Sequence, residues 1–244
     1  MQHQIEGSMT AEEINAQIVG TFPRDLPIDL LDAVVARARL AHELVRDNTD
    51  LTGRSARGLE GQARFRLMEK GFQDVCERHG GLRLDGDMIP GTDLRCFQPF
   101  MRFGGDRPGV ILGLASIPER AELPSKNQSR LAGVTLNYHL TPRLDFERDG
   151  RTAKPGDIFV LLLCARDPSR GGSLQEVAIG VIDADYQGFL VYKSVEAFLA
   201  EYAPDPDGPE SANSPPLVSL KTVRKEFKPP EQPDIEESAD GPAK

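Results

Sequence analysis

The stretch of residues 158–167, IFVLLLCARD, limits what this chain can fold into more than any other part of the sequence. Its apolar residues run without interruption up to Arg166, and residues 154–157 and 168–172 bound it with Pro, Gly and charged residues. A run this short and this apolar predicts a strand that is buried on both faces. We therefore expect it to form the centre of a sheet.

Hydrophobic periodicity and capping residues predict the helices. Thr10 and Glu13 have the spacing of a capping box, and Ser125 and Ser194 each precede an apolar-periodic segment as candidate N-caps. Pro27 suits the first turn of a helix. The expected helices cover residues 10–18, 27–46, 59–79, 125–140 and 195–202.

The remaining ordered segments predict strands. They cover residues 82–85, 93–103, 109–117, 158–167, 176–183 and 189–192. A turn at residues 104–108 joins the second of these strands to the third, and the first three strands together are typical of an antiparallel meander. The fold class that we expect is mixed α/β, with a largely antiparallel central sheet flanked by helices.

Changes in composition predict three regions in the chain. Residues 1–53 form an N-terminal helical extension, residues 54–203 an α/β core domain, and residues 204–244 a proline-rich acidic tail. The tail holds nine of the 19 prolines, so it has too little apolar surface to offset the entropy of ordering and is expected to be disordered. An apolar island at residues 217–227 is a candidate docking motif for a protein partner.

Charge and cysteine content restrict the classes of partner. The net charge of −9 gives no general attraction to nucleic acid or to anionic membranes, so any such binding requires a local basic face. No apolar segment reaches the roughly 20 residues that cross a bilayer, and the N-terminus has no signal-peptide core. Cys76, Cys96 and Cys164 have no paired spacing. We expect a cytoplasmic protein with reduced thiols and no membrane partner.

One segment is basic within this acidic chain. Between Arg54 and Arg83 there are seven Arg and Lys residues against four Asp and Glu residues. Arginines in such a segment can neutralise the phosphates of a nucleic acid whatever its base sequence. The same composition is also typical of a helix face that is simply exposed to solvent. The candidate nucleic-acid-binding residues are Arg64, Arg66 and Lys70, together with Arg130 on the helix expected at residues 125–140.

The order of elements over residues 59–167 is helix, three-strand meander, helix and strand. This order resembles the core of the PD-(D/E)XK nucleases, which have the restriction-endonuclease-like fold. The resemblance implies that Glu60, at the start of the first helix, and Asp93, at the start of the second strand, hold Mg²⁺. It also implies a Glu-x-Lys motif on the third strand.

The third strand departs from that pattern, because VILGLASI contains no charged side chain between Val110 and Ile117. Phosphodiester hydrolysis of this type needs two or three carboxylates on Mg²⁺ and a lysine near the attacking water. Glu119, Glu122 and Lys126 follow the strand and are the candidates for a migrated site. The catalytic candidates are thus Glu60, Asp93 and Lys126, and the metal-binding candidates are Glu60, Asp93 and Glu119.

Three functions remain open at this point. The first is a nucleic-acid-associated protein with a degenerate, non-catalytic nuclease-like domain and no cofactor. The second is a regulatory or interaction protein that forms a homo-oligomer through its N-terminal helices and binds a protein partner through its tail. The third is an active Mg²⁺-dependent nuclease with the migrated site. The sequence contains no phosphate-binding loop, dinucleotide fingerprint or zinc-protease motif.

Overall fold

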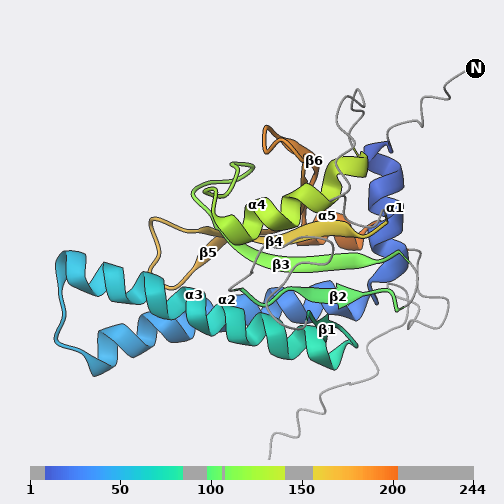
Figure 1. Ribbon diagram of the computed structural model, residues 1–244. Coiled ribbons are helices and arrows are strands. Elements are labelled where there is room, and N and C mark those ends of the chain that lie inside the picture. Colours follow the sequence, from blue (N-terminus) through green and yellow to red (C-terminus); the bar gives the residue numbers. More distant parts are fainter. Residues whose placement is uncertain (1–8, 85–97, 106–107, 141–155, 203–244) are drawn as a thin grey trace, which may run out of the picture. The chain divides into compact units, whose positions relative to one another are not determined.

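A computed structural model describes residues 9–84, 98–105, 108–140 and 156–202 (Figure 1). One six-stranded sheet runs through it, with the strands in the order β1-β2-β3-β4-β5-β6. The strands are β1 (Leu82–Arg83), β2 (Met101–Phe103), β3 (Val110–Ile117), β4 (Ile158–Arg166), β5 (Leu174–Ile182) and β6 (Phe189–Ser194). β3 and β4 are parallel, and the other neighbouring pairs are antiparallel. The predicted mixed α/β class is confirmed.

The apolar run forms β4, a central strand of the sheet. Leu162 lies opposite Leu114 of β3 and Ile179 of β5, so both edges of β4 are paired. Every side chain from Ile158 to Ala165 is buried. Because successive residues of a strand point to opposite faces, this burial requires a packed layer on each side of the sheet.

Helices supply both layers (Figure 1). One face packs against α1 (Ala11–Thr21), α2 (Asp25–Asn48), α3 (Gly53–Arg78) and α5 (Val195–Leu199). The other face packs against α4 (Gln128–Thr135) and the short 3₁₀ helix η2 (Leu136–Leu140). None of the helices that the structure describes combines the length and the apolar character needed to cross a bilayer.

Two of the helix starts follow the predicted capping chemistry. The Thr10 hydroxyl accepts the Glu13 N–H at 3.2 Å, and the Glu13 carboxylate accepts the Thr10 N–H at 2.7 Å. The Ser194 hydroxyl accepts the Ala197 N–H at 3.2 Å and begins α5. Both caps satisfy backbone donors that have no partner inside the helix.

The predicted start of α4 is wrong by a few residues. The cap is Asn127, whose side-chain oxygen accepts the Arg130 N–H at 2.8 Å, and Ser125 lies outside the helix. Serine and asparagine are equally good caps, so sequence alone does not separate two candidates this close together. The α-helix also ends at Thr135, and η2 continues in its place to Leu140.

α3 begins at Gly53, within the segment that the sequence predicts to be a polar connector. Two glycines and a serine between residues 53 and 58 give that segment low helix propensity. Propagating an existing helix costs much less than nucleating one, and the packed part of α3 provides the nucleus.

The N-terminal helices are part of the main core, although the sequence assigns residues 1–53 to an extension. Ile14 and Ile18 of α1 and Leu30 and Val34 of α2 are almost completely buried in the same cluster as the sheet. An amphipathic pattern shows which side of a helix is buried but not what covers it. The predicted tail, residues 204–244, lies outside the described residues.

Asn137 on η2 joins two strands at the point where their direct pairing stops. β4 and β5 pair from Leu161 and Gly180 onward. Beyond that pair, toward the start of β4 and the end of β5, Asn137 connects the two strands. Its amide nitrogen donates to the Phe159 carbonyl at 3.0 Å and to the Ile182 carbonyl at 2.9 Å. Its amide oxygen accepts the Phe159 N–H at 2.7 Å. Asn137 is completely buried, so these backbone groups have no access to water that could take over its hydrogen bonds.

We expect Asn137→Leu to lower the free energy of unfolding by about 3 kcal/mol or more, because each buried backbone group left unpaired costs about 1–3 kcal/mol. Asn127→Ala, which removes only a helix cap, should cost about 1 kcal/mol. Urea unfolding of both variants and the parent measures the difference. An Asn137 variant no less stable than the Asn127 variant would contradict this role.

Asp157 holds the starts of two parallel strands together. Its carboxylate accepts from the Arg102 Nε at 2.9 Å, from the Arg102 Nη2 at 3.1 Å and from the Gly109 N–H at 2.8 Å. Burial opposes the charged form, but the bonds from Arg102 and Gly109 outweigh it and lower the pKa of Asp157 below its usual value.

A carboxyl group with a lowered pKa in the folded state stabilises the protein above its unfolded pKa and loses this effect as the pH falls through the folded value. The stability difference between the parent and Asp157→Asn should therefore be constant near pH 7 and shrink below about pH 4. Urea unfolding at several pH values measures it. A difference that is unchanged down to pH 3 would contradict the ion pair.

Candidate nucleic-acid interface

α2 and α3 form a helical hairpin whose closed end projects past the strands (Figure 1). The turn between β4 and β5 packs against this hairpin through glycine. A Cβ on Gly171 would lie 2.3 Å from the His42 Cε1 atom of α2, and Gly172 has a φ of +74° that favours glycine. The turn therefore fixes the carboxyl end of β4 beside the two helices.

Glu60 of α3 lies in an internal ion-pair cluster at this contact. Glu60 is only 8% exposed. One of its carboxylate oxygens lies 3.1 Å from the His42 Nδ1 atom, and the other lies 3.4 Å from the Arg64 Nη1 atom. Both oxygens thus have protein partners. Glu60 is positioned as the counter-charge of Arg64.

The other candidate metal ligands do not join Glu60 within the described residues. Glu119 and Glu122 are exposed in the loop after β3, and Asp93 lies outside the part of the chain that the structure describes. In that described part, no three His, Cys, Asp or Glu side chains are grouped so that they could hold a metal ion.

Positive charge exceeds negative charge next to Glu60. Arg166 follows Leu162 and Cys164 on the β4 face that α2 and α3 cover. Its Nε atom is buried and has no hydrogen-bond partner among the described residues. Burial and the nearby charge of Arg166 lower the pKa of Arg64, and Glu60 offsets this only in part. Within the described part of the chain, the Arg166 guanidinium therefore has no carboxylate paired with it.

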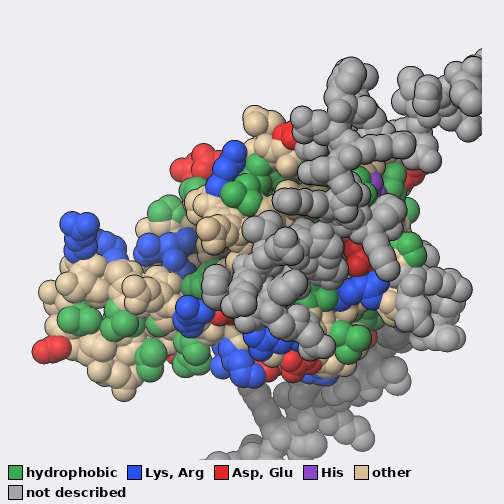
Figure 2. Space-filling model, viewed as in Figure 1, with side chains coloured by type: hydrophobic (Ala, Val, Ile, Leu, Met, Phe, Trp, Pro, Cys, Tyr) green, Lys and Arg blue, Asp and Glu red, His purple; other side chains and the backbone are tan. Residues whose placement is uncertain are grey.

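The basic residues along α3 fall into two groups. Arg66 pairs with Glu69 at 2.9 Å, and Lys70 pairs with Asp74, so each has an acidic neighbour on its own helix. Nearer the start of α3, Arg54 and Arg57 are exposed, and neither has a hydrogen bond or ion pair with the described residues. Figure 2 shows Lys and Arg side chains over the projecting end of the hairpin.

Two further candidate residues lie on α4 and the loop before it. Arg130 is only 7% exposed and donates to the Ser125 carbonyl oxygen, so it is not part of the exposed basic surface that the sequence suggests. The Lys126 Nζ atom lies 5.3 Å from the centre of the Tyr186 ring, a distance that allows a cation–π contact. Lys126 as a whole is exposed in the loop before α4.

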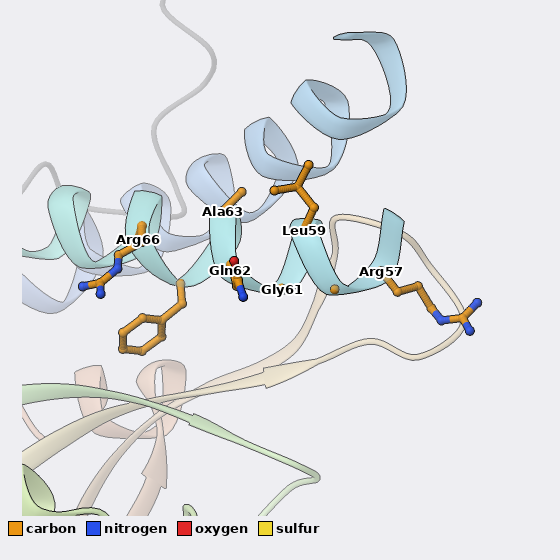
Figure 3. A pocket seen from close by; sticks show the side chains of 8 residues that line it. Arg57, Leu59, Gly61, Gln62, Ala63 and Arg66 are labelled. Carbon is orange, nitrogen blue, oxygen red and sulfur yellow. The ribbon is translucent and has the colours of Figure 1, made fainter. Parts of the chain in front are cut away.

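An open depression of about 850 Å³ lies along the first half of α3. Its lining residues are Arg57, Gly58, Leu59, Gly61, Gln62, Ala63, Phe65 and Arg66. In Figure 3, Arg57 and Arg66 stand toward opposite ends of this lining, with Gly61 and Gln62 between them. The helical periodicity of the sequence puts Phe65 on the same side of α3 as Met68 and Phe72 and predicts that all three are buried. Met68 and Phe72 are buried, whereas Phe65 is half-buried and belongs to neither core cluster.

Comparisons with known proteins add no family to this description. A scan against protein-family models found no match, and neither did searches of curated proteins and of solved structures.

We expect Glu60→Ala to lower the free energy of unfolding by about 3 kcal/mol, because removing one partner of a buried ion pair leaves the other charge uncompensated. Adding Arg64→Met should restore part of that loss. The control Asp74→Ala, which breaks the exposed pair with Lys70, should cost less than about 1 kcal/mol.

Urea unfolding of these variants measures the three differences. Thermal unfolding with and without Mg²⁺ tests the alternative role of Glu60. A melting temperature that rises with Mg²⁺ in the parent but not in Glu60→Ala would contradict the internal ion pair and favour a metal ligand.

Proposed function

We propose that this protein associates with nucleic acid and does not cleave it. The contacts come from a surface that we call the arginine face: Arg54, Arg57, Arg64 and Arg66 of α3 together with Arg166 of β4. The observation that carries the proposal is that Arg54, Arg57 and Arg166 have no acidic partner among the described residues.

Unpaired arginines favour an external anion for two reasons. An arginine in an ion pair has to give up its carboxylate before it binds phosphate, and Arg54 and Arg57 have none to give up. The buried Arg166 Nε also lacks an acceptor, and an unsatisfied buried donor costs about 1–3 kcal/mol. A phosphate oxygen that reaches this atom would recover that cost.

A phosphate polymer fits the rest of the charge distribution. The chain has a net charge of −9, so its overall field repels nucleic acid. At physiological salt, exposed charges interact over only about 8 Å, and a local cluster can therefore attract phosphates in spite of the overall charge. Binding through such a cluster is independent of base sequence and sensitive to salt.

Two features support the proposed lack of catalysis, and a third supports the nuclease-like fold. β3 contains no charged side chain, so it supplies neither the carboxylate nor the lysine of the nuclease motif. Both oxygens of Glu60 are engaged by His42 and Arg64. The element order α3, β1, β2, β3, α4, β4 is the order on which the resemblance to the PD-(D/E)XK nucleases rests, and it supports a degenerate member of that fold.

We expect Arg54→Glu combined with Arg57→Glu to weaken binding of a labelled oligonucleotide by about tenfold or more at low salt. Each lost phosphate contact should also reduce the slope of log affinity against log salt by about 1. Both residues are exposed, so folding should be unaffected. The control is Arg78→Glu with Arg83→Glu, which makes the same charge change at the last residue of α3 and on β1.

Fluorescence anisotropy across a salt series measures both effects. Equal losses in the two double variants, or no binding by the parent protein, would overturn the proposal. The same oligonucleotide incubated with Mg²⁺ or Mn²⁺ and separated on a denaturing gel should stay intact. Cleavage that Asp93→Ala abolishes would instead establish an active nuclease.

A further inference from the structure

The depression on α3 has the residue types of a site for a nucleic-acid base. It combines one aromatic side chain, Phe65, and one amide, Gln62, with arginines at both ends. Proteins that bind single strands use such combinations, in which bases stack on aromatic rings while basic groups follow the backbone.

Phe65 is placed differently from Met68 and Phe72, the next two large apolar residues on its side of α3. Met68 and Phe72, one and two turns further along, are 1% and 0% exposed and pack in the main core. Phe65 is half-buried, lines the depression and packs in neither core cluster. Its ring is held by the helix but remains accessible from the depression.

Two glycines in the same depression have no packing role. A Cβ added to Gly58 or to Gly61 would meet no atom within 4 Å, and neither residue has a positive φ. Glycine inside a helix costs roughly 1 kcal/mol relative to alanine, so each of them destabilises α3 without a compensating contact. Because glycine has no side chain, these two positions widen the depression and let a ligand approach the helix backbone closely.

The spacing of the two flanking arginines fits several nucleotides. Arg66 follows Arg57 by nine positions, which corresponds to roughly 14 Å along the helix axis. A strand of B-form DNA covers this distance with about four nucleotides, at 3.4 Å each. A single phosphate does not span it, whereas a backbone segment of several nucleotides does.

We propose that the arginine face binds single-stranded nucleic acid, with one unpaired base stacked on Phe65 in the depression and its edge beside Gln62. Arg57 holds one backbone phosphate, and the exposed Arg66 exchanges its ion pair with Glu69 for a second phosphate. This proposal rests on the proposed function and specifies its ligand. In a duplex the faces of the bases are stacked on one another, so the ring of Phe65 has no base to contact.

The test compares a fluorescein-labelled 12-nucleotide oligothymidine with a labelled duplex of the same length. The parent protein should bind the single strand more tightly than the duplex. Phe65→Leu should weaken binding of the single strand about tenfold or more, leave binding of the duplex unchanged and leave the salt dependence unchanged, because stacking is lost while the phosphate contacts remain.

Gly61→Leu provides a second variant that does not depend on removing an aromatic residue. It fills the depression and raises the helix propensity, so the variant should be at least as stable as the parent while binding the single strand more weakly. Gly20→Leu on α1, where an added Cβ also meets nothing within 4 Å, is the matched control and should bind normally.

Equal affinity for the single strand and the duplex, with no effect of Phe65→Leu or Gly61→Leu, would overturn this inference and leave the proposed phosphate binding in place. Binding of neither oligonucleotide by the parent would overturn both proposals. Loss of single-strand binding in the two depression variants but not in the α1 control supports the base site.

Discussion

The burial of β4 on both faces is the constraint on which the rest of this structure depends. Eight consecutive apolar side chains can leave water only if a layer of helices covers each face of the sheet. On the α4 side the fit is close, because a Cβ on Gly133 would lie 2.4 Å from the Phe159 ring. A glycine at position 133 lowers the helix propensity of α4, but it allows the helix to pack closely against the strand. Asn137 then supplies the hydrogen-bond partners that the start of β4 lacks.

The two ends of β4 differ in how their charges are satisfied. At the amino end, Asp157 is fully bonded to Arg102 and the Gly109 N–H. At the carboxyl end, the Arg166 Nε atom has no acceptor among the described residues, and the nearby carboxylate of Glu60 is already shared by His42 and Arg64. The first end is closed and stabilises the strand pair. The second end has an excess of positive charge next to the projecting α2–α3 hairpin, and this difference locates the proposed binding surface.

A small basic surface on an acidic protein has consequences for selectivity. The overall charge keeps polyanions away from most of the molecule, so only a ligand that reaches the arginine face gains favourable contacts. Phosphate contacts alone do not distinguish single strands from duplexes. In the proposed base site, the aromatic ring and the glycines of the depression add that distinction, since they would favour a base that is free to leave its stack.

Local patterns in the sequence were enough to predict most of the strands and helices and several of their ends: the apolar run of β4, the capping box at Thr10 and Glu13, and the cap at Ser194. The strand expected at residues 93–103 is an exception, because β2 begins at Met101 and residues 93–97 lie outside the described residues. The sequence also located the basic segment that contains Arg64 and Arg66. Only the tertiary structure decided that α1 and α2 belong to the core, that Glu60 is an internal counter-charge, that Arg130 is buried and that Phe65 faces a depression. Periodicity gives the direction of a side chain relative to its own helix or strand, whereas its partners come from segments far apart in the chain. The unpaired state of Arg166 is the clearest case, since it depends on α2, α3 and the β4–β5 turn meeting at one place.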